Sequence, residues 1–195
     1  MSPRIASVKR TTKETDVRIE LALDGDGSAT VDTGLPFFDH MLQQLGTHAG
    51  WDLEVVAKGD LDVDGHHTVE DVGIALGQAL AEALGDKKGI RRFASITVPL
   101  DEAAVEVALD LSGRSFVLHD VDIPAETIGT FDTGLVEDFV RAFATTAQMT
   151  LQVRLRSGRS PHHVVEAEFK ALAKALGDAC SPTGRGSTPS TKGVL

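Results

Sequence analysis

The apolar and polar positions of this chain follow two periods, and the resulting elements return in the same order in both halves. Strict alternation is typical of half-buried strands, and apolar residues at every third or fourth position are typical of amphipathic helices. The predicted strands are residues 5–11, 17–23, 28–32 and 52–58, followed by 93–100, 104–111, 115–121 and 150–156. The predicted helices are residues 36–47, 67–84, 134–147 and 162–176.

Proline and glycine define several of the predicted helix ends. Pro36 stands in the first turn of its helix, where a missing N–H is tolerated. Gly85 and Gly177 directly follow the last apolar residue of their helices. Because glycine is favoured just beyond a helix C-terminus, we expect the two helices to end at these residues.

Two short sequence motifs, called words below, appear twice in the chain. Asp-Thr-Gly-Leu begins at residue 32 and again at residue 132, 100 positions later. His-His-x-x-Glu begins at residue 66 and again at residue 162, 96 positions later, so the second connection is four residues shorter. Together with the repeated element order, the words predict an α+β fold of two duplicated β-β-β-α-β-α halves.

Each half is expected to form a sheet with both helices on one face, since every element must cover its apolar side. The two helix layers then pack together between two outer sheets. We place the first half-repeat at residues 1–90 and the second at residues 91–180. Residues 181–195 are rich in Gly, Ser, Thr and Pro and predict a flexible C-terminal tail.

The repeated His-His-x-x-Glu word indicates a binding site for divalent metal ions. Neighbouring residues on a helix diverge by about 100°, so His66 and His67 do not easily bind one ion together. Glu70 lies one turn away from both, and the spacing suits two different ions, one per histidine. Imidazole with carboxylate favours Mn, Fe or Zn over Ca or Mg. The zinc-protease words His-Glu-x-x-His and His-x-x-Glu-His are absent from the sequence, which argues against a water-activating protease.

Two further residues are candidates for the metal shell. His40 stands near the start of the helix at 36–47. Asp138 stands at nearly the same place in the second half and offers a carboxylate for the matching role.

Composition narrows the range of partners. The formal net charge is −10 and the pI is about 5.1, which disfavours sequence-independent binding to nucleic acid or to an anionic membrane. The one cysteine, Cys180, excludes an intrachain disulfide and favours a cytoplasmic location. Residues 1–8 lack the apolar run of a signal peptide, and no apolar stretch approaches the ~20 residues that span a bilayer.

The chain resembles the imidazoleglycerol-phosphate dehydratase family from about residue 3 to residue 195. The words that support the resemblance are Thr-Gly-Leu-Pro-Phe-Phe-Asp-His-Met at 33–41, Asp-Gly-His-His-Thr-Val-Glu-Asp-Val-Gly-Ile at 64–74, Arg-Phe at 92–93, Pro-Leu-Asp-Glu-Ala at 99–103, Asp-Leu-Ser-Gly-Arg at 110–114, His-His-Val-Val-Glu-Ala-Glu-Phe-Lys-Ala-Leu at 162–172 and Pro-Ser-Thr-Lys-Gly at 189–193. No other family known to us combines these words in this order.

The resemblance implies a fold like domain 2 of ribosomal protein S5 and a homo-oligomeric shell of 24 subunits with active sites between subunits. It implies two Mn²⁺ per site and the dehydration of imidazoleglycerol phosphate to imidazole-acetol phosphate in histidine biosynthesis. The implied metal ligands are His40, His66, His67, Glu70, His162, His163 and Glu166, with Asp138 where the family has histidine.

Substrate and catalytic roles also follow from the resemblance. Glu14 matches the family's catalytic glutamate, and the tail is expected to contribute to the phosphate site. The implied substrate-binding residues are His48, Arg92, Asp101, Arg114, Lys170, Ser190 and Lys192. Glu168 is a further carboxylate that could touch the substrate.

The sequence departs from the family at three places. Asp138 replaces a histidine, Gln152 replaces the histidine of a Thr-Leu-His word, and residues 158–161 differ from the commonest pattern. Asp138 and Gln152 leave one rival hypothesis, a metal-loaded shell without catalysis, and the intact Glu14, Arg92, Arg114 and Lys192 argue against it. A second rival hypothesis is a metal-dependent hydrolase of phosphorylated heterocycles.

Overall fold

The first half of the chain folds into a four-stranded sheet with two helices. A computed structural model describes residues 3–184, 186–193 and 195. The strands are β1 (Ile5–Thr11), β2 (Thr15–Ala22), β3 (Ala29–Asp32) and β4 (Asp52–Gly59), in the spatial order β1-β2-β4-β3. The helices are α1 (Pro36–Ala49) and α2 (His66–Leu84). β3 pairs parallel with β4, while the other pairs are antiparallel.

The second half repeats this arrangement. Its strands are β5 (Phe93–Leu100), β6 (Ala103–Asp110), β7 (Phe116–Asp120) and β10 (Thr150–Ser157), in the order β5-β6-β10-β7. β7 pairs parallel with β10, as β3 does with β4. The helices are α3 (Leu135–Thr146) and α4 (Pro161–Cys180). The predicted duplicated α+β fold is therefore confirmed.

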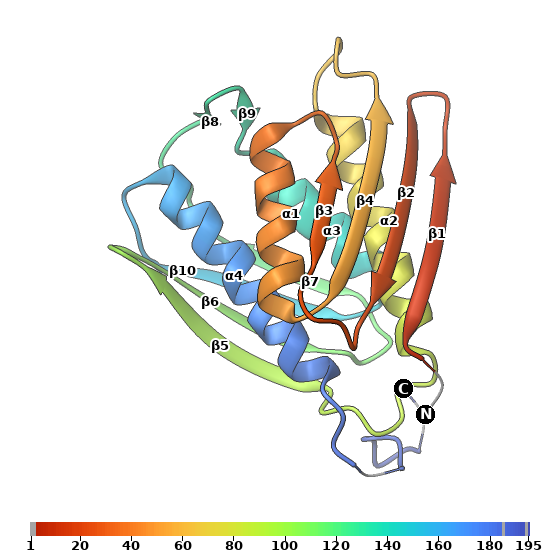
Figure 1. Cartoon of the computed structure of the whole chain (residues 1–195). Helices are drawn as coiled ribbons and strands as arrows, with labels where there is room; N and C mark the ends of the chain where they lie inside the picture. The colour runs from red at the N-terminus through yellow and green to blue at the C-terminus, as the bar shows by residue number, and fades with distance from the viewer. Residues whose placement is uncertain (1–2, 185, 194) are drawn as a thin grey trace.

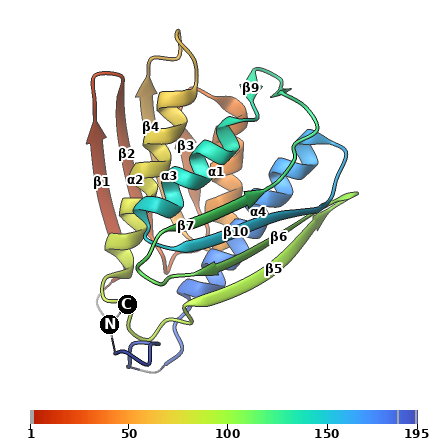
Figure 2. The ribbon, with the colours of Figure 1, turned by 180° about the vertical axis from the view of Figure 1, so that it is seen from behind.

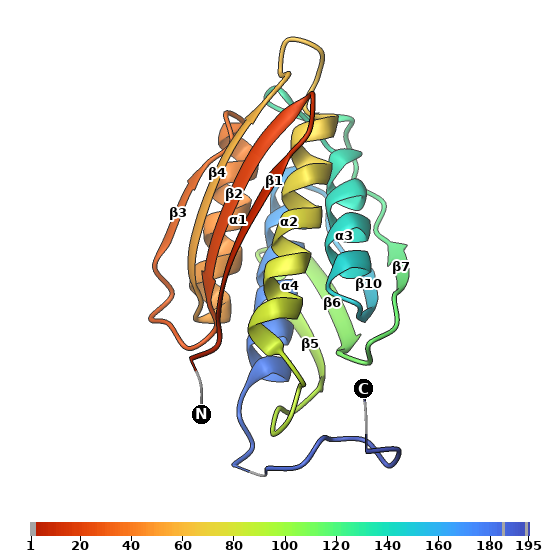
Figure 3. The same ribbon diagram turned by 90° about the vertical axis from the view of Figure 1, so that its right-hand side faces the viewer.

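The two sheets form the outer layers and the four helices lie between them (Figures 1 and 3). The central strands β2 and β6 alternate buried with more exposed residues, so each sheet turns one apolar face toward the helices. α2 packs on β1 and β2, and α4 packs on β5 and β6. The helices pair across the halves, α1 with α4 and α2 with α3, and buried residues of both halves form one core.

One predicted helix end is wrong. α4 continues past Gly177 to Cys180, whereas the other glycine, Gly85, does cap α2. A Cβ atom at Gly177 would lie 2.7 Å from the carbonyl oxygen of Ala49, at the C-terminus of α1. The glycine therefore allows α1 and α4 to approach closely, and local helix-end preference is overridden by packing between helices.

The sequence pattern also missed a small hairpin. β8 (Thr127–Ile128) and β9 (Phe131–Asp132) form a two-stranded sheet just before α3, visible at the upper left of Figure 1 and again in Figure 2. Strands of two residues are too short to show a period. Among the described residues, no helix combines the length and apolarity needed to span a bilayer.

Candidate metal and substrate site

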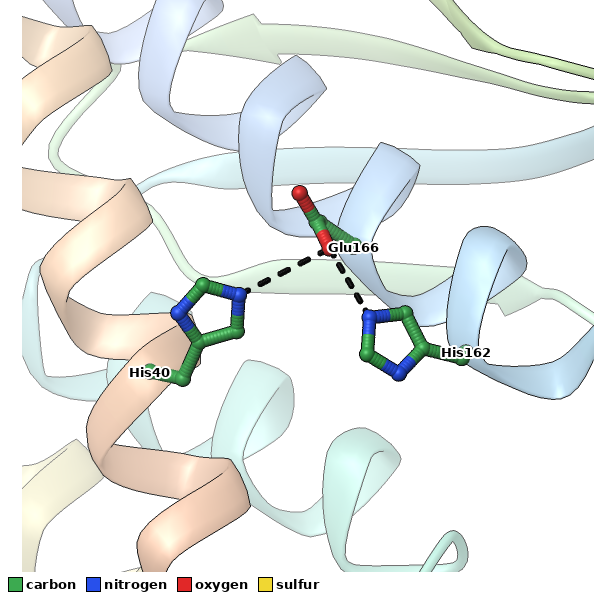
Figure 4. A group of neighbouring side chains, drawn as sticks. All are labelled: His40, His162 and Glu166. Atoms are coloured by element: carbon green, nitrogen blue, oxygen red, sulfur yellow. Dashed lines mark hydrogen bonds and ion pairs between the residues drawn. The ribbon is translucent and has the colours of Figure 1, made fainter.

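Three of the predicted metal ligands meet where the first turns of α4 lie against α1. Glu166 Oε2 lies 3.0 Å from His162 Nε2 and 3.6 Å from His40 Nε2, and Figure 4 shows both rings turned toward this carboxylate. The three ligand atoms all lie within 4.8 Å of one another. Ligands of one transition-metal ion are roughly 3–4 Å apart, given metal–ligand distances of about 2.0–2.2 Å. Two imidazoles and a carboxylate at this spacing fit Mn, Fe or Zn.

Packing and helix starts set this geometry. Pro161 opens α4, so His162 and Glu166 stand one turn apart on the same side of the helix. The ring of Phe37 packs edge-on against His162, with ring centroids 5.4 Å apart. Burial opposes ionisation of Glu166, but Lys170 (Nζ to Oε1 2.6 Å) and His162 outweigh burial and lower its pKa.

The other half has a corresponding cluster between α2 and α3. His66 Nδ1 lies 3.3 Å from Asp138 Oδ2, so Asp138 faces the first His-His pair much as His40 faces the second. Glu70 is exposed one turn further along α2. A pocket of about 510 Å³ contains His66 and Asp138 and is bordered by Phe131 and Asp132 of the β8–β9 hairpin.

The second histidine of each pair points elsewhere. The rings of His66 and His67 are 6.0 Å apart and nearly perpendicular, and those of His162 and His163 are 6.2 Å apart. His67 Nδ1 lies 3.0 Å from Asp60 Oδ2, and this hydrogen bond raises the pKa of His67. The neighbouring histidines therefore face different partners, as the helical geometry predicts for ligands of two ions.

His163 repeats the arrangement of His67 with a different carboxylate. Its Nδ1 lies 2.8 Å from Glu102 Oε2 in the turn between β5 and β6, and this hydrogen bond raises the pKa of His163. Sequence reasoning gave neither Asp60 nor Glu102 a role. The one feature of the sequence that could have indicated these two partners is their position. Each is a carboxylate just after the end of a strand, and that end of the strand lies beside a His-His pair in the fold.

Glu14 lies in the turn of the β1–β2 hairpin and is exposed. Its charge contributes to the raised pKa of His67, which places the predicted catalytic carboxylate near the first histidine pair. Asp71 fastens the hairpin to α2, because its buried carboxylate accepts hydrogen bonds from Arg10 Nε (2.7 Å) and from the Thr15 hydroxyl. Sequence reasoning did not identify this link.

His48 and Lys170 lie further along the contact between α1 and α4. His48 Nε2 is 3.0 Å from Gln44 Oε1. Burial together with the charges of Lys170 and Lys174 lowers the pKa of His48, so the ring is neutral at pH 7. A neutral imidazole here can donate to or accept from a substrate group.

Four predicted phosphate-binding residues meet at the opposite end of the molecule. Arg92, Arg114, Ser190 and Lys192 line one pocket of about 560 Å³ with the tail as one wall. Arg92 adopts φ 76°, a conformation that is rare for residues other than glycine and is often kept at functional sites. Its guanidinium is held by Asp110 (Nε to Oδ1 2.6 Å) and lies 4.4 Å from the Phe93 ring centre. Of the predicted tail, Arg185 and Val194 lie outside the described residues.

Within one chain the predicted site residues fall at two ends. Arg92 directly precedes β5, and Asp101, whose φ of 49° is also unusual, directly follows it. Asp101 lies beside His163 (Oδ2 to Nε2 3.9 Å). At about 3.3 Å per residue, these two ends of β5 are roughly 30 Å apart. Figure 1 shows the tail below the sheets and the start of α4 above.

Two other residues of interest face away from these clusters. Glu168 is 1% exposed and lies 2.9 Å from His119 Nε2, so it is not placed to touch a substrate within this chain. Gln152 pairs with Ala108 and Leu118 in the sheet, and its side chain points to the outer face because Leu151 and Val153 face the core.

Fold and site together define a duplicated two-sheet α+β protein with paired imidazole–carboxylate clusters. A model of the imidazoleglycerol-phosphate dehydratase family matches residues 33–176. The chain is 54% identical over 194 residues to imidazoleglycerol-phosphate dehydratase of Acidothermus cellulolyticus, covering 100% of this chain and 94% of the relative. It is 52% identical over 194 residues to the chloroplastic enzyme of Pisum sativum, covering 98% of this chain and 69% of that protein.

Solved structures agree with the sequence relatives. The crystal structure of imidazoleglycerol-phosphate dehydratase from Staphylococcus aureus matches with a TM-score of 0.84 and 37% identity over 92% of this chain and 99% of that one. The crystal structure of IGPD from Pyrococcus furiosus in complex with (S)-C348 matches with a TM-score of 0.84 and 36% sequence identity. The match covers 96% of this chain and 100% of that one. The chain belongs to the imidazoleglycerol-phosphate dehydratase family. It is a hydro-lyase of histidine biosynthesis.

Proposed function

We propose that this chain removes water from imidazoleglycerol phosphate to give imidazole-acetol phosphate, and that it uses two Mn²⁺ per active site. The observation that supports this most strongly is the convergence of His40, His162 and Glu166 at metal-ligand spacing. The His66–Asp138 cluster supports a second ion in the corresponding place. Bound Mn²⁺ would supply Lewis-acid stabilisation of charge on the imidazole ring of the substrate.

The protein's own groups would bind and orient the substrate. Arg92, Arg114 and Lys192 offer a cationic pocket for its phosphate, and arginine binds phosphate oxygens through two parallel hydrogen bonds. Dehydration breaks one C–OH bond and one C–H bond of the glycerol side chain, and the resulting enol becomes the ketone. Glu14 is the proposed acid–base group that accepts the carbon-bound proton and returns a proton to the departing hydroxyl.

We further propose that the working site is completed by a second copy of the chain. The substrate is roughly 10 Å long, counting bonds of about 1.5 Å from ring to phosphate. The phosphate pocket and the His163–Asp101 region lie about 30 Å apart in one chain, so one substrate cannot reach both. Contacts between copies in a homo-oligomer, for which we propose 24 subunits, would bring one copy's phosphate pocket to another copy's histidines.

The decisive experiment is turnover of imidazoleglycerol phosphate by metal-free protein reloaded with Mn²⁺. We expect ketone product without release of inorganic phosphate, in an assembly whose mass is measured in the same preparation. Phosphate release would favour the hydrolase, and bound metal without any product would favour the non-catalytic shell. The variant Glu14→Gln should keep its metal and lose most of its turnover. Unchanged turnover in this variant would contradict the role of Glu14.

A further inference from the structure

The two carboxylate oxygens of Glu102 have different partners. Oε1 accepts hydrogen bonds from the backbone N–H groups of Ser160 (2.7 Å) and Arg159 (3.1 Å). Oε2 lies 2.8 Å from His163 Nδ1. The loop before α4 therefore fixes which oxygen of Glu102 faces the histidine.

This arrangement determines where His163 carries its proton. The backbone N–H groups of Arg159 and Ser160 both donate to Oε1 of Glu102, and a glutamate carboxylate is ordinarily ionised at neutral pH, so Oε2 has no proton and only accepts a hydrogen bond. The Nδ1 atom of His163 must then be the donor. In the neutral ring, Nε2 keeps a free lone pair, which is the form of imidazole that binds a metal ion.

His67 has a similar but less constrained partner. Its Nδ1 lies 3.2 Å from Asp60 Oδ1 and 3.0 Å from Oδ2, so both oxygens face the same ring atom. Within the described residues, no backbone N–H group is bonded to the Asp60 carboxylate. Either oxygen of Asp60 can therefore serve His67, and the two histidines differ in how strictly their proton is placed.

We propose that Glu102 is a positioning residue that holds His163 in the tautomer with the proton on Nδ1, and that the backbone of Arg159 and Ser160 enforces this choice. The inference rests on the proposed role of His163 as a metal ligand. Glu102 acts through the histidine and needs no contact with the substrate. The loop contributes N–H groups that any residue except proline supplies at 159 and 160, so its unusual side chains leave the interaction intact.

The test uses Glu102→Gln, with Asp60→Asn as the matched control. In Glu102→Gln, the two loop N–H groups select the amide oxygen, and the amide NH₂ is turned toward His163 Nδ1. The ring must then accept at Nδ1 and carry its proton on Nε2. In Asp60→Asn, the side chain can turn its oxygen to His67, and the tautomer is kept.

Two measurements on the full-length protein give the result. Nitrogen-15 NMR of His163 in the metal-free protein, at an alkaline pH where the ring is neutral, should show the proton on Nδ1 in the native chain and on Nε2 in Glu102→Gln. Calorimetric titration with Mn²⁺ should show affinity about 10- to 100-fold weaker in Glu102→Gln, the range typical of outer partners of metal-binding histidines. Asp60→Asn should stay within a few-fold of the native affinity.

Contrary outcomes separate this inference from the proposed function. A proton on Nε2 of His163 in the native chain overturns it without any variant, even if Glu102→Gln does not fold. An unchanged tautomer in a folded Glu102→Gln also overturns it. If the tautomer changes and the Mn²⁺ affinity does not, Glu102 is not a positioning residue for metal binding. If His163→Ala then also keeps native affinity, the failure lies in the proposed ligand role of His163.

Discussion

Asp71 offers a quantitative test of how the hairpin that carries Glu14 is held. Asp71→Asn keeps the shape of the side chain but removes the negative charge of the carboxylate that accepts hydrogen bonds from Arg10 and Thr15. A hydrogen bond to a charged group contributes about 1.5–3 kcal/mol, and the value is toward the low end here because Arg10 is 33% exposed. We expect the variant to weaken the docking of the hairpin on α2 by about 2 kcal/mol.

Hydrogen exchange is the direct assay for this loss. A loss of ~2 kcal/mol corresponds to roughly 30-fold faster exchange through local opening. The reporting amide is that of Thr12, which donates to the carbonyl oxygen of Thr15 across the turn (2.8 Å). The control Arg18→Gln removes the exposed pair Arg18–Glu54 on the same sheet and should change stability by at most ~1 kcal/mol. Unchanged exchange at Thr12 in Asp71→Asn would refute the hairpin anchor.

Turnover in the same variant tests whether the anchor serves Glu14. A displacement of about 1 Å in a catalytic group can lower the rate up to 100-fold, so kcat should fall by at least tenfold in Asp71→Asn. The loss should vanish in the Glu14→Gln background, because the residue that Asp71 positions has already been removed. Equal losses in both backgrounds would show that Asp71 acts independently of Glu14.

Three other changes test separate parts of the structure. Gly177→Ala should lower the free energy of unfolding by about 1–3 kcal/mol in thermal or denaturant melts, since its Cβ would lie 2.7 Å from the Ala49 carbonyl oxygen, and native stability would contradict the close approach of α1 and α4. Burial disfavours charge on His119, but Glu168 and Glu137 outweigh both burial and the nearby Arg141 and raise the pKa of His119. The stabilisation that the His119–Glu168 pair gives the folded chain is therefore complete below about pH 6.5, the ordinary pKa of histidine, and is lost as the pH rises through the higher pKa of His119 in the folded chain. Unfolding melts at several pH values should show this decline in the native chain and not in His119→Gln. Arg92→Ala should raise KM for imidazoleglycerol phosphate more than it lowers kcat, and an unaltered KM in steady-state assays would remove Arg92 from the phosphate pocket.

Much of this fold could be predicted because its local and global preferences agree. Alternation in residues 17–23 and 104–111 marks the central strands β2 and β6, whose one-sided burial requires it. The spacing of the repeated words predicted the duplication. Gly177 misled the prediction of a helix end because its role depends on Ala49, a residue 128 positions earlier in the chain. No local pattern reports such a contact.

The sequence indicated which residue types gather at the candidate site, but it did not indicate which side chains pair with one another there. The helical period separated His66 from His67 and His162 from His163, and the rings do point to different partners. Asp60 and Glu102 were missed because their partners come from other elements, and a carboxylate at a strand end is common on any surface. The distance between Arg92 and Asp101 depends on the element that joins them, since nine positions cover about 30 Å along a strand but only about 14 Å along a helix.

Mn²⁺ stoichiometry tests the central claim most directly, namely that the paired imidazole–carboxylate clusters hold two divalent ions per chain. Metal-free protein should be reloaded with Mn²⁺, dialysed and analysed for metal and protein together. We predict two Mn²⁺ per chain in the native protein and close to none in a folded His66→Ala/His162→Ala double variant, because each cluster then loses an imidazole. Retention of two ions per chain by the double variant would contradict the account.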